Sequence, residues 1–182
     1  MKVKTAVSIL SIACLLAILA AACGVSPPAE DQGSKLSEIE QLYDEAKYKD
    51  AMNVARYNLN KDPKDPVTIV VVWKTQVLQG TKSIEYVQEF FKRASEKVPE
   101  YGSELVPPLA RALKTDANNP VRLFCLLCLG ELPDEAAGNE IASVFDPGYT
   151  MGDKPSNVTL DYLKSEANRL LEQRGYTKHL NQ

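Results

Sequence analysis

Histidine is nearly absent from the sequence, and so are the motifs that most often mark a catalytic or nucleotide-binding site. The single histidine, His179, lies in a polar tail, where it is a poor candidate for a general base. No Gly-x-Ser-x-Gly elbow and no glycine-rich phosphate loop occur in the 182 residues. The sequence therefore predicts a protein that is not an enzyme and that holds no cofactor and no metal.

Clusters of basic residues are also missing. The chain has 21 lysines and arginines against 24 aspartates and glutamates, which gives a net charge of −3. Removal of residues 1–22 would take away Lys2 and Lys4 and no acidic residue, so the net charge would fall to −5. A mildly acidic protein without a basic patch lacks the charge that binds phosphate backbones, and we expect no nucleic-acid partner. One group of acids, which we expect to form a solvated helix face, consists of Glu38, Glu40, Asp44 and Glu45.

The start of the chain has the three parts of a bacterial export signal. Lys2 and Lys4 provide a positive beginning, and Thr5–Leu19 is an apolar run interrupted only by two serines. Ala20–Ala22 then place small side chains directly before Cys23, where a signal peptidase needs an extended backbone that it can grip. The pattern predicts export of the folded part of the chain.

The segment Leu-Ala-Ala-Ala-Cys that ends at Cys23 resembles the lipobox of bacterial lipoproteins, although Ala20 stands where that family prefers a large aliphatic residue. The resemblance implies that residues 1–22 are a signal peptide and that lipid on Cys23, including palmitate, anchors the protein to a membrane. Residues 23–34 then form a flexible tether. Gly24 replaces the aspartate that commonly retains such proteins at the inner membrane, so the resemblance implies the outer membrane, facing the periplasm, if the organism is Gram-negative.

Two other interpretations of the same segment remain open. Ala20 and Ala22 also fit the small-x-small cleavage site of an ordinary secreted protein. The stretch Thr5–Ala22 is near the lower length of a membrane-spanning helix, so an uncleaved anchor is the second alternative. The Pro, Gly, Ser and acidic residues in 23–34 favour the lipoprotein, because a folded body on a lipid anchor needs such a spacer.

From residue 35 onward the apolar residues recur with a helical period, so residues 35–182 are expected to form one all-α domain. The expected helices cover 36–46, 51–59, 66–78, 84–98, 105–113, 121–132, 134–145 and 158–174. The segment Val67–Leu78 is ambiguous, because its β-branched run is typical of a buried strand. Asp65 and Pro66 form a good helix start and Gly80 a good end, and we therefore expect a helix there.

The segment 121–132 is apolar nearly all round, so this helix is expected near the centre of the domain. It contains Cys125 and Cys128 in a Cys-x-x-Cys arrangement, which also occurs in redox and metal sites. A redox thiol favours an exposed helix N-terminus, and zinc needs more ligands than these two thiols provide. We expect both cysteines to pack in the core.

Two segments resemble families of helical repeats. The first, which is similar to a tetratricopeptide repeat, carries the matching residues Tyr48, Ala51 and Pro63. The second, 105–136, resembles a HEAT-type repeat, with Asp116 and Arg122 near the turn between its helices. In that family such a pair ties neighbouring units together, so the resemblance implies structural roles for both residues. Together the resemblances imply a short α-solenoid of about four stacked helix pairs.

A lipid-tethered repeat protein of this kind would act as a protein-binding adaptor or assembly accessory at the cell envelope, with a protein or peptide as its partner. Tetratricopeptide-like lipoproteins serve as pilotins and as outer-membrane assembly accessories, which is one version of this role. The alternative is a small-ligand binder or enzyme that uses the long loop Asp146–Pro155. In that case Tyr149, Asp153 and Lys154 are the residues to test.

Overall fold

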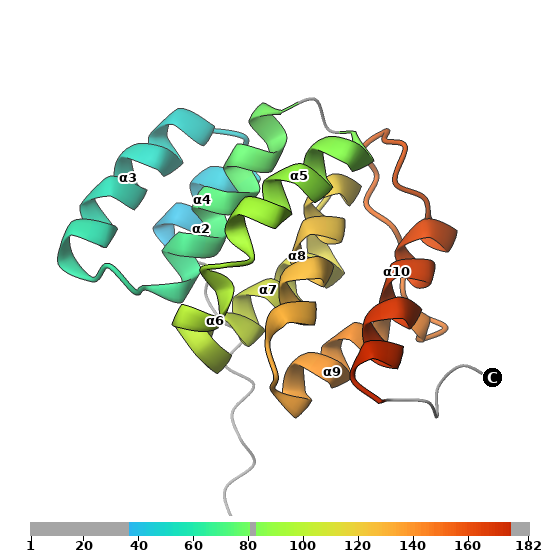
Figure 1. The fold of residues 1–182 in the computed structure, drawn as a ribbon. Coiled ribbons are helices and arrows are strands. Elements are labelled where there is room, and N and C mark those ends of the chain that lie inside the picture. The colour runs from blue at the N-terminus through green and yellow to red at the C-terminus, as the bar shows by residue number, and fades with distance from the viewer. Residues whose placement is uncertain (1–36, 81–82, 176–182) are drawn as a thin grey trace, which may run out of the picture. The chain divides into compact units, whose positions relative to one another are not determined.

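The computed structural model describes residues 37–80 and 83–175, and this part of the chain is all-helical, without a strand (Figure 1). The export segment, Cys23, the predicted tether and His179 lie outside the described residues. The α-helices are α2 (Glu38–Asp44), α3 (Tyr48–Lys61), α4 (Pro66–Gln79), α5 (Ile84–Ala94), α6 (Val98–Tyr101), α7 (Val106–Thr115), α8 (Asn119–Glu131), α9 (Glu135–Ala142) and α10 (Leu160–Gln173). Two 3-10 helices are η1 (Gly102–Leu105) and η2 (Ser143–Phe145). Among the helices in the described ranges, none is both long enough and apolar enough to cross a membrane.

The ambiguous segment Val67–Leu78 is a helix, as predicted, and forms most of α4. The side chain of Asp65 accepts a hydrogen bond from the backbone N–H of Val67, and Pro66 occupies the first turn, where its missing N–H costs nothing. Most side chains of α4 are buried, which explains why its composition lacks a polar face. Burial on several sides, rather than strand formation, accounts for the run of valines.

The prediction of one continuous helix over 84–98 is wrong. The structure has two helices, α5 ending at Ala94 and the short α6 beginning at Val98. Pro99 explains the interruption, because it has no N–H to donate to the carbonyl four residues earlier and restricts the residue before it. Pro99 therefore stands in the first turn of a new helix.

Helix α8 lies at the centre of the described helices, as its composition predicted. Every residue from Asn119 to Leu129 is buried, and α8 packs against α4, α5, α7, α9 and α10 (Figure 1). Its carbonyl end is held by Arg174, whose guanidinium donates to the carbonyls of Leu129, Gly130, Leu132 and Asp134. A cation at this end of a helix satisfies carbonyls that have no partner within the helix.

Two groups of buried apolar side chains lie on different sides of α4. The larger group, here called the main core, surrounds α8 and includes Trp73, Phe124 and Leu163. The smaller group, called the N-terminal core, joins α2, α3 and α4 and consists of Ile39, Tyr43, Ala51, Ala55 and Val71. Helix α4 contributes to both cores, so it separates them and links them.

Candidate functional site

A small pocket opens where α2, α4 and α7 meet, between the two cores. Its volume is about 40 Å³. Helix α2 contributes Glu40 and Asp44 to its wall; the other lining residues are Val67, Val70, Val71 and Lys74 of α4 and Pro108, Arg111, Ala112 and Thr115 of α7. We refer to it as the α2–α7 pocket. Its wall combines an apolar surface with two acidic and two basic side chains.

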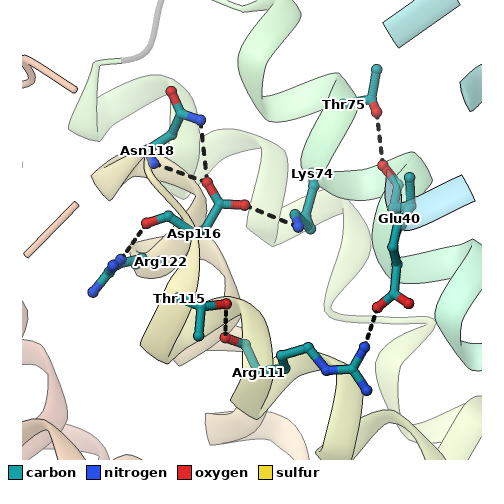
Figure 2. A network of polar contacts seen from close by, with 9 residues as sticks. Glu40, Lys74, Thr75, Arg111, Thr115, Asp116, Asn118 and Arg122 are labelled. Atoms are coloured by element: carbon teal, nitrogen blue, oxygen red, sulfur yellow. Dashed lines mark hydrogen bonds and ion pairs between the residues drawn. The ribbon is translucent and has the colours of Figure 1, made fainter. Parts of the chain in front are cut away.

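A buried ion pair lies beside this pocket. The Lys74 Nζ is 3.0 Å from Oδ2 of Asp116, and both side chains are almost completely buried (Figure 2). The same Nζ lies 3.8 Å from the centre of the Tyr43 ring, which adds a cation–π contact. Burial, and next the negative charge of Asp116, raise the pKa of Tyr43, so its phenol stays neutral at physiological pH. The ion pair connects α4 with the residue that follows α7.

Asp116 is also the centre of the turn between α7 and α8. Its Oδ1 accepts hydrogen bonds from the backbone and side-chain nitrogens of Asn118, at 2.9 and 3.2 Å. Its backbone carbonyl accepts from Nε of Arg122 at 2.6 Å (Figure 2). Nη1 of Arg122 donates to the carbonyl of Thr150 at 2.5 Å. The two residues singled out by the HEAT-type resemblance therefore meet here. Asp116 reaches back to α4, and Arg122 reaches forward to the loop before α10.

A second ion pair crosses the pocket from α7 to α2. Nη1 of Arg111 lies 2.6 Å from Oε1 of Glu40 (Figure 2), while the other carboxylate oxygen of Glu40 accepts from Ser37. Glu40 completes a capping box at the start of α2, so its orientation is fixed from two directions. The pair holds α2 at a defined distance from α7 across the opening.

Asp44, at the end of α2, is the charged residue of this pocket that lacks a partner. Within the described ranges its carboxylate makes neither an ion pair nor a hydrogen bond, and the residue is exposed on its outer side. Partial burial raises the pKa of Asp44, and the nearby Lys74 ammonium acts in the opposite direction. Asp44 is therefore a carboxylate that would gain from a positively charged neighbour.

The prediction that Glu38, Glu40, Asp44 and Glu45 form one solvated helix face is wrong for one of these four residues. Glu38, Asp44 and Glu45 are exposed, and Glu45 pairs with Lys47 at 2.6 Å. Glu40 departs from the prediction, because its side chain is largely covered and bound to Arg111. Sequence reasoning also missed Lys74. The signal was present, since Lys74 is the one charged residue in the otherwise apolar helix α4.

Cys125 and Cys128 are fully buried free cysteines in α8. Burial raises the pKa of Cys125 to about 12 and that of Cys128 well above its ordinary value. Both thiols are therefore protonated near neutral pH, whereas redox and metal chemistry use the thiolate. No group of three potential metal-ligating side chains occurs in the ranges 37–80 and 83–175.

The loop between η2 and α10 borders a second hollow of about 300 Å³. The hollow is lined by Lys114, Ser143, Asp146, Gly148, Tyr149 and Thr150. Of the three loop residues singled out from the sequence, the structure brings only Tyr149 to this hollow; Asp153 and Lys154 are exposed elsewhere on the loop. The Tyr149 hydroxyl already donates to the carbonyl of Leu113 at 2.9 Å.

This loop is firmly attached to the α7–α8 turn. Asn119 bonds both the N–H and the carbonyl of Gly152, at 2.7 and 3.3 Å, and the N–H of Lys154 donates to the carbonyl of Ala117 at 3.1 Å. A Cβ added to Gly152 would come within 2.3 Å of that same carbonyl oxygen, so the close approach requires glycine. The loop therefore completes the fold around α8.

Comparison of the chain with protein-family models, with curated proteins and with solved structures found no match. Function must therefore follow from the residues and their geometry. Of the two hollows, the α2–α7 pocket joins charged side chains from three helices, and the loop hollow is bordered mainly by η2 and the residues after it.

Proposed function

We propose that the protein is a membrane-anchored envelope lipoprotein, lipidated on Cys23, that acts as a protein-binding adaptor or assembly accessory and not as an enzyme. In a Gram-negative organism it would face the periplasm from the outer membrane. The observation that carries the adaptor role is the α2–α7 pocket, in which apolar and charged side chains of α2, α4 and α7 meet at one opening. An apolar surface with charged groups around it is suited to a protein partner.

We further propose that the helices form a short α-solenoid of four pairs, α2/α3, α4/α5, α7/α8 and α9/α10. The packing of α2 on α3, of α7 on α8 and of α9 on α10 supports this pairing, as does the contact of α4 with both α2 and α7. In such an array α2, α4 and α7 would be the corresponding helices of successive units. Stacked units create extended binding surfaces, and the pocket would lie on one of them.

The size of the pocket favours a partner protein over a free metabolite. Pockets that enclose small molecules commonly measure roughly 300–1,000 Å³. A volume of about 40 Å³ has room for one functional group of a larger molecule. The pocket is therefore suited to anchoring one side chain of a partner whose other contacts lie on the surrounding helices.

Site-specific photo-crosslinking in cells tests the adaptor role. A photo-reactive phenylalanine analogue replaces the exposed Thr115 at the pocket, and, as a matched control, the exposed Ser165 on α10. We expect one envelope protein to be captured from position 115 and not from position 165. Equal capture at the two positions, or none at position 115, would reject the adaptor role of this surface.

Lipid attachment needs its own test. Metabolic labelling with palmitate should mark the wild-type protein and should not mark Cys23→Ser. Labelling of both proteins, or of neither, would contradict the lipoprotein assignment and leave simple secretion or an uncleaved anchor as the explanation.

The loop hollow supports a second candidate function, the binding of a small polar ligand. Its volume of about 300 Å³ and its hydroxyl and charged side chains, including Lys114 and Asp146, are compatible with such a ligand. Native mass spectrometry of the protein purified from its own envelope would reveal a bound molecule. A bound molecule lost in Asp146→Asn and retained in Asp44→Asn would favour this function over the adaptor role.

A further inference from the structure

The charges around the α2–α7 pocket do not cancel. Two ion pairs, Lys74 with Asp116 and Arg111 with Glu40, account for both basic residues at 3.0 and 2.6 Å. Asp44 is a third carboxylate that forms no ion pair within the described residues, although the charges of Lys74 and Arg111 reach it. The pocket and its immediate wall therefore carry one uncompensated negative charge, which selects for a positively charged group.

An anionic group is disfavoured for the same reason. A carboxylate or phosphate would have to draw Lys74 from Asp116 or Arg111 from Glu40. Removing Lys74 from its partner would leave the almost completely buried carboxylate of Asp116 without a counter-charge, which is strongly unfavourable. A cation placed against Asp44 would disturb neither pair.

The pocket also offers a surface for the stem of a long cationic side chain. Val67, Val70 and Val71 of α4 and Pro108 of α7 line the pocket, and of these four only Val67 is not buried and can offer its side chain to a partner. Lysine and arginine place their methylene chains on apolar surface while the charged head reaches a polar partner. The volume of about 40 Å³ suffices for an ammonium or guanidinium head and is too small for a whole metabolite.

The rest of α2 would assist the approach of a cation. Glu38 is exposed in the first turn of this short helix, and no basic residue occupies its last turn. Exposed charges of one sign raise the local concentration of the opposite charge and speed encounter. The Lys47 ammonium, which follows α2, is itself paired with Glu45.

From these observations we propose that the α2–α7 pocket anchors one lysine or arginine side chain of the protein partner, with the cationic head against Asp44 and the stem against Val67 of α4. This inference rests on the proposed adaptor function and names the chemistry that the pocket recognises. Asp44 is the residue that gives the pocket its preference for a cation.

Peptide titration followed by NMR tests the proposal on the full chain in detergent. The probes are three blocked pentapeptides, Ac-Ala-Ala-X-Ala-Ala-amide, with lysine, norleucine or glutamate at X. We expect saturable shifts of amide signals in α2, α4 and α7 with the lysine peptide alone. Equal binding of the norleucine peptide, or stronger binding of the glutamate peptide, would overturn the proposal.

Two variants that change charge equally make the test specific. Asp44→Asn should weaken binding of the lysine peptide roughly fivefold, as expected for a partly exposed ion pair. Glu45→Gln removes a neighbouring carboxylate that points to Lys47 and should leave the affinity unchanged. If both variants weaken binding equally, the pocket attracts cations only through general charge and the specific role of Asp44 is wrong.

Failure of this inference and failure of the adaptor role give different results. Continued crosslinking from position 115 without selective binding of the lysine peptide would reject the cation specificity and retain the adaptor. Loss of capture at position 115 in wild-type protein would reject the adaptor itself, whatever the peptides do.

Discussion

The main core surrounds a helix whose residues Asn119–Leu129 are all buried, and it includes large side chains such as Phe124 and Trp73. The N-terminal core has five buried side chains, and two of them are the alanines Ala51 and Ala55. Hydrophobic stabilisation grows with the apolar area that is buried. The two regions must therefore depend to different degrees on contacts other than apolar packing.

Polar contacts beside the α2–α7 pocket add to the apolar packing that holds the N-terminal core in place. Arg111 binds Glu40 of α2, and the Lys74–Asp116 pair joins α4 to the α7–α8 turn, with Tyr43 of α2 against the Lys74 ammonium. Helices α2 and α3 are thus held to the rest of the protein partly by ion pairs and hydrogen bonds. We expect α2 and α3 to open at a lower free energy than α8. The α2–α7 pocket lies where α2 meets α4 and α7.

The largest effect on the free energy of unfolding should come from a substitution in the main core. Phe124 is fully buried and contacts the rings of Trp73 and Phe90, at 5.9 and 5.1 Å between centroids. Phe124→Ala should lower the free energy of unfolding by about 3–5 kcal/mol, through lost burial and a cavity. Urea unfolding measures this change. Tyr57→Ala is the control, because that ring is 59% exposed; its effect should stay within about 0.5 kcal/mol. Similar losses in the two variants would contradict the position of the main core.

The next largest effect on the free energy of unfolding should come from breaking the buried ion pair between Lys74 and Asp116. Asp116→Asn leaves the Lys74 ammonium buried without a counter-charge and should cost about 3 kcal/mol in unfolding free energy. Lys74→Met combined with Asp116→Asn should be more stable than Asp116→Asn alone, because the buried charge has been removed. If the stability loss of the double variant equals the sum of the losses of Lys74→Met and of Asp116→Asn measured alone, the two residues are not coupled.

A smaller and more local effect is expected in the N-terminal core. Ile39 is 1% exposed, and Ile39→Ala should cost about 2 kcal/mol. Because α2 and α3 depend on few apolar contacts, the change should increase proteolysis and amide exchange in these helices and leave α8 protected. Ile141→Ala, in the main core, is the matched control and should weaken α8 as well. Uniform loss of protection in Ile39→Ala would mean that the two cores unfold together.

The smallest effect is predicted for the ion pair between α7 and α2. The Arg111 side chain is 36% exposed, so Arg111→Gln should cost at most about 1 kcal/mol. Lys114 lies on α7 like Arg111 but pairs with Glu140 of α9, so Lys114→Gln is a matched control. Arg111→Gln should raise amide exchange in α2, and Lys114→Gln should not. The opposite pattern would show that the Arg111–Glu40 pair does not attach α2 to α7.

Much of the helical fold could be predicted because it follows from local signals. The Asp65–Pro66 start correctly indicated a helix over a run of valines, and the all-round apolar composition of α8 correctly indicated its central position. The last helix ends at another local signal, Gly175, which has a φ of 75° and whose N–H donates to the carbonyl of Glu172. These features depend on residues within a few positions of one another.

The site could not be predicted in the same way, because its contacts join distant parts of the chain. Lys74 is the one charged residue of α4 and was missed, and nothing local indicated Asp116 as its partner. Arg111 and Glu40 belong to helices far apart in sequence, so Glu40 was wrongly placed on a solvated face. The break between α5 and α6 was missed for another reason. The apolar period continues through Val98, although Pro99 interrupts the backbone hydrogen bonds.

Native-state hydrogen exchange on the wild-type protein measures whether the helices of the N-terminal core open separately from the main core. We expect amides of α2 and α3 to exchange through an opening of lower free energy, and amides of α8 to exchange only on global unfolding. Equal opening free energies for α2, α3 and α8 across increasing denaturant would contradict this expectation.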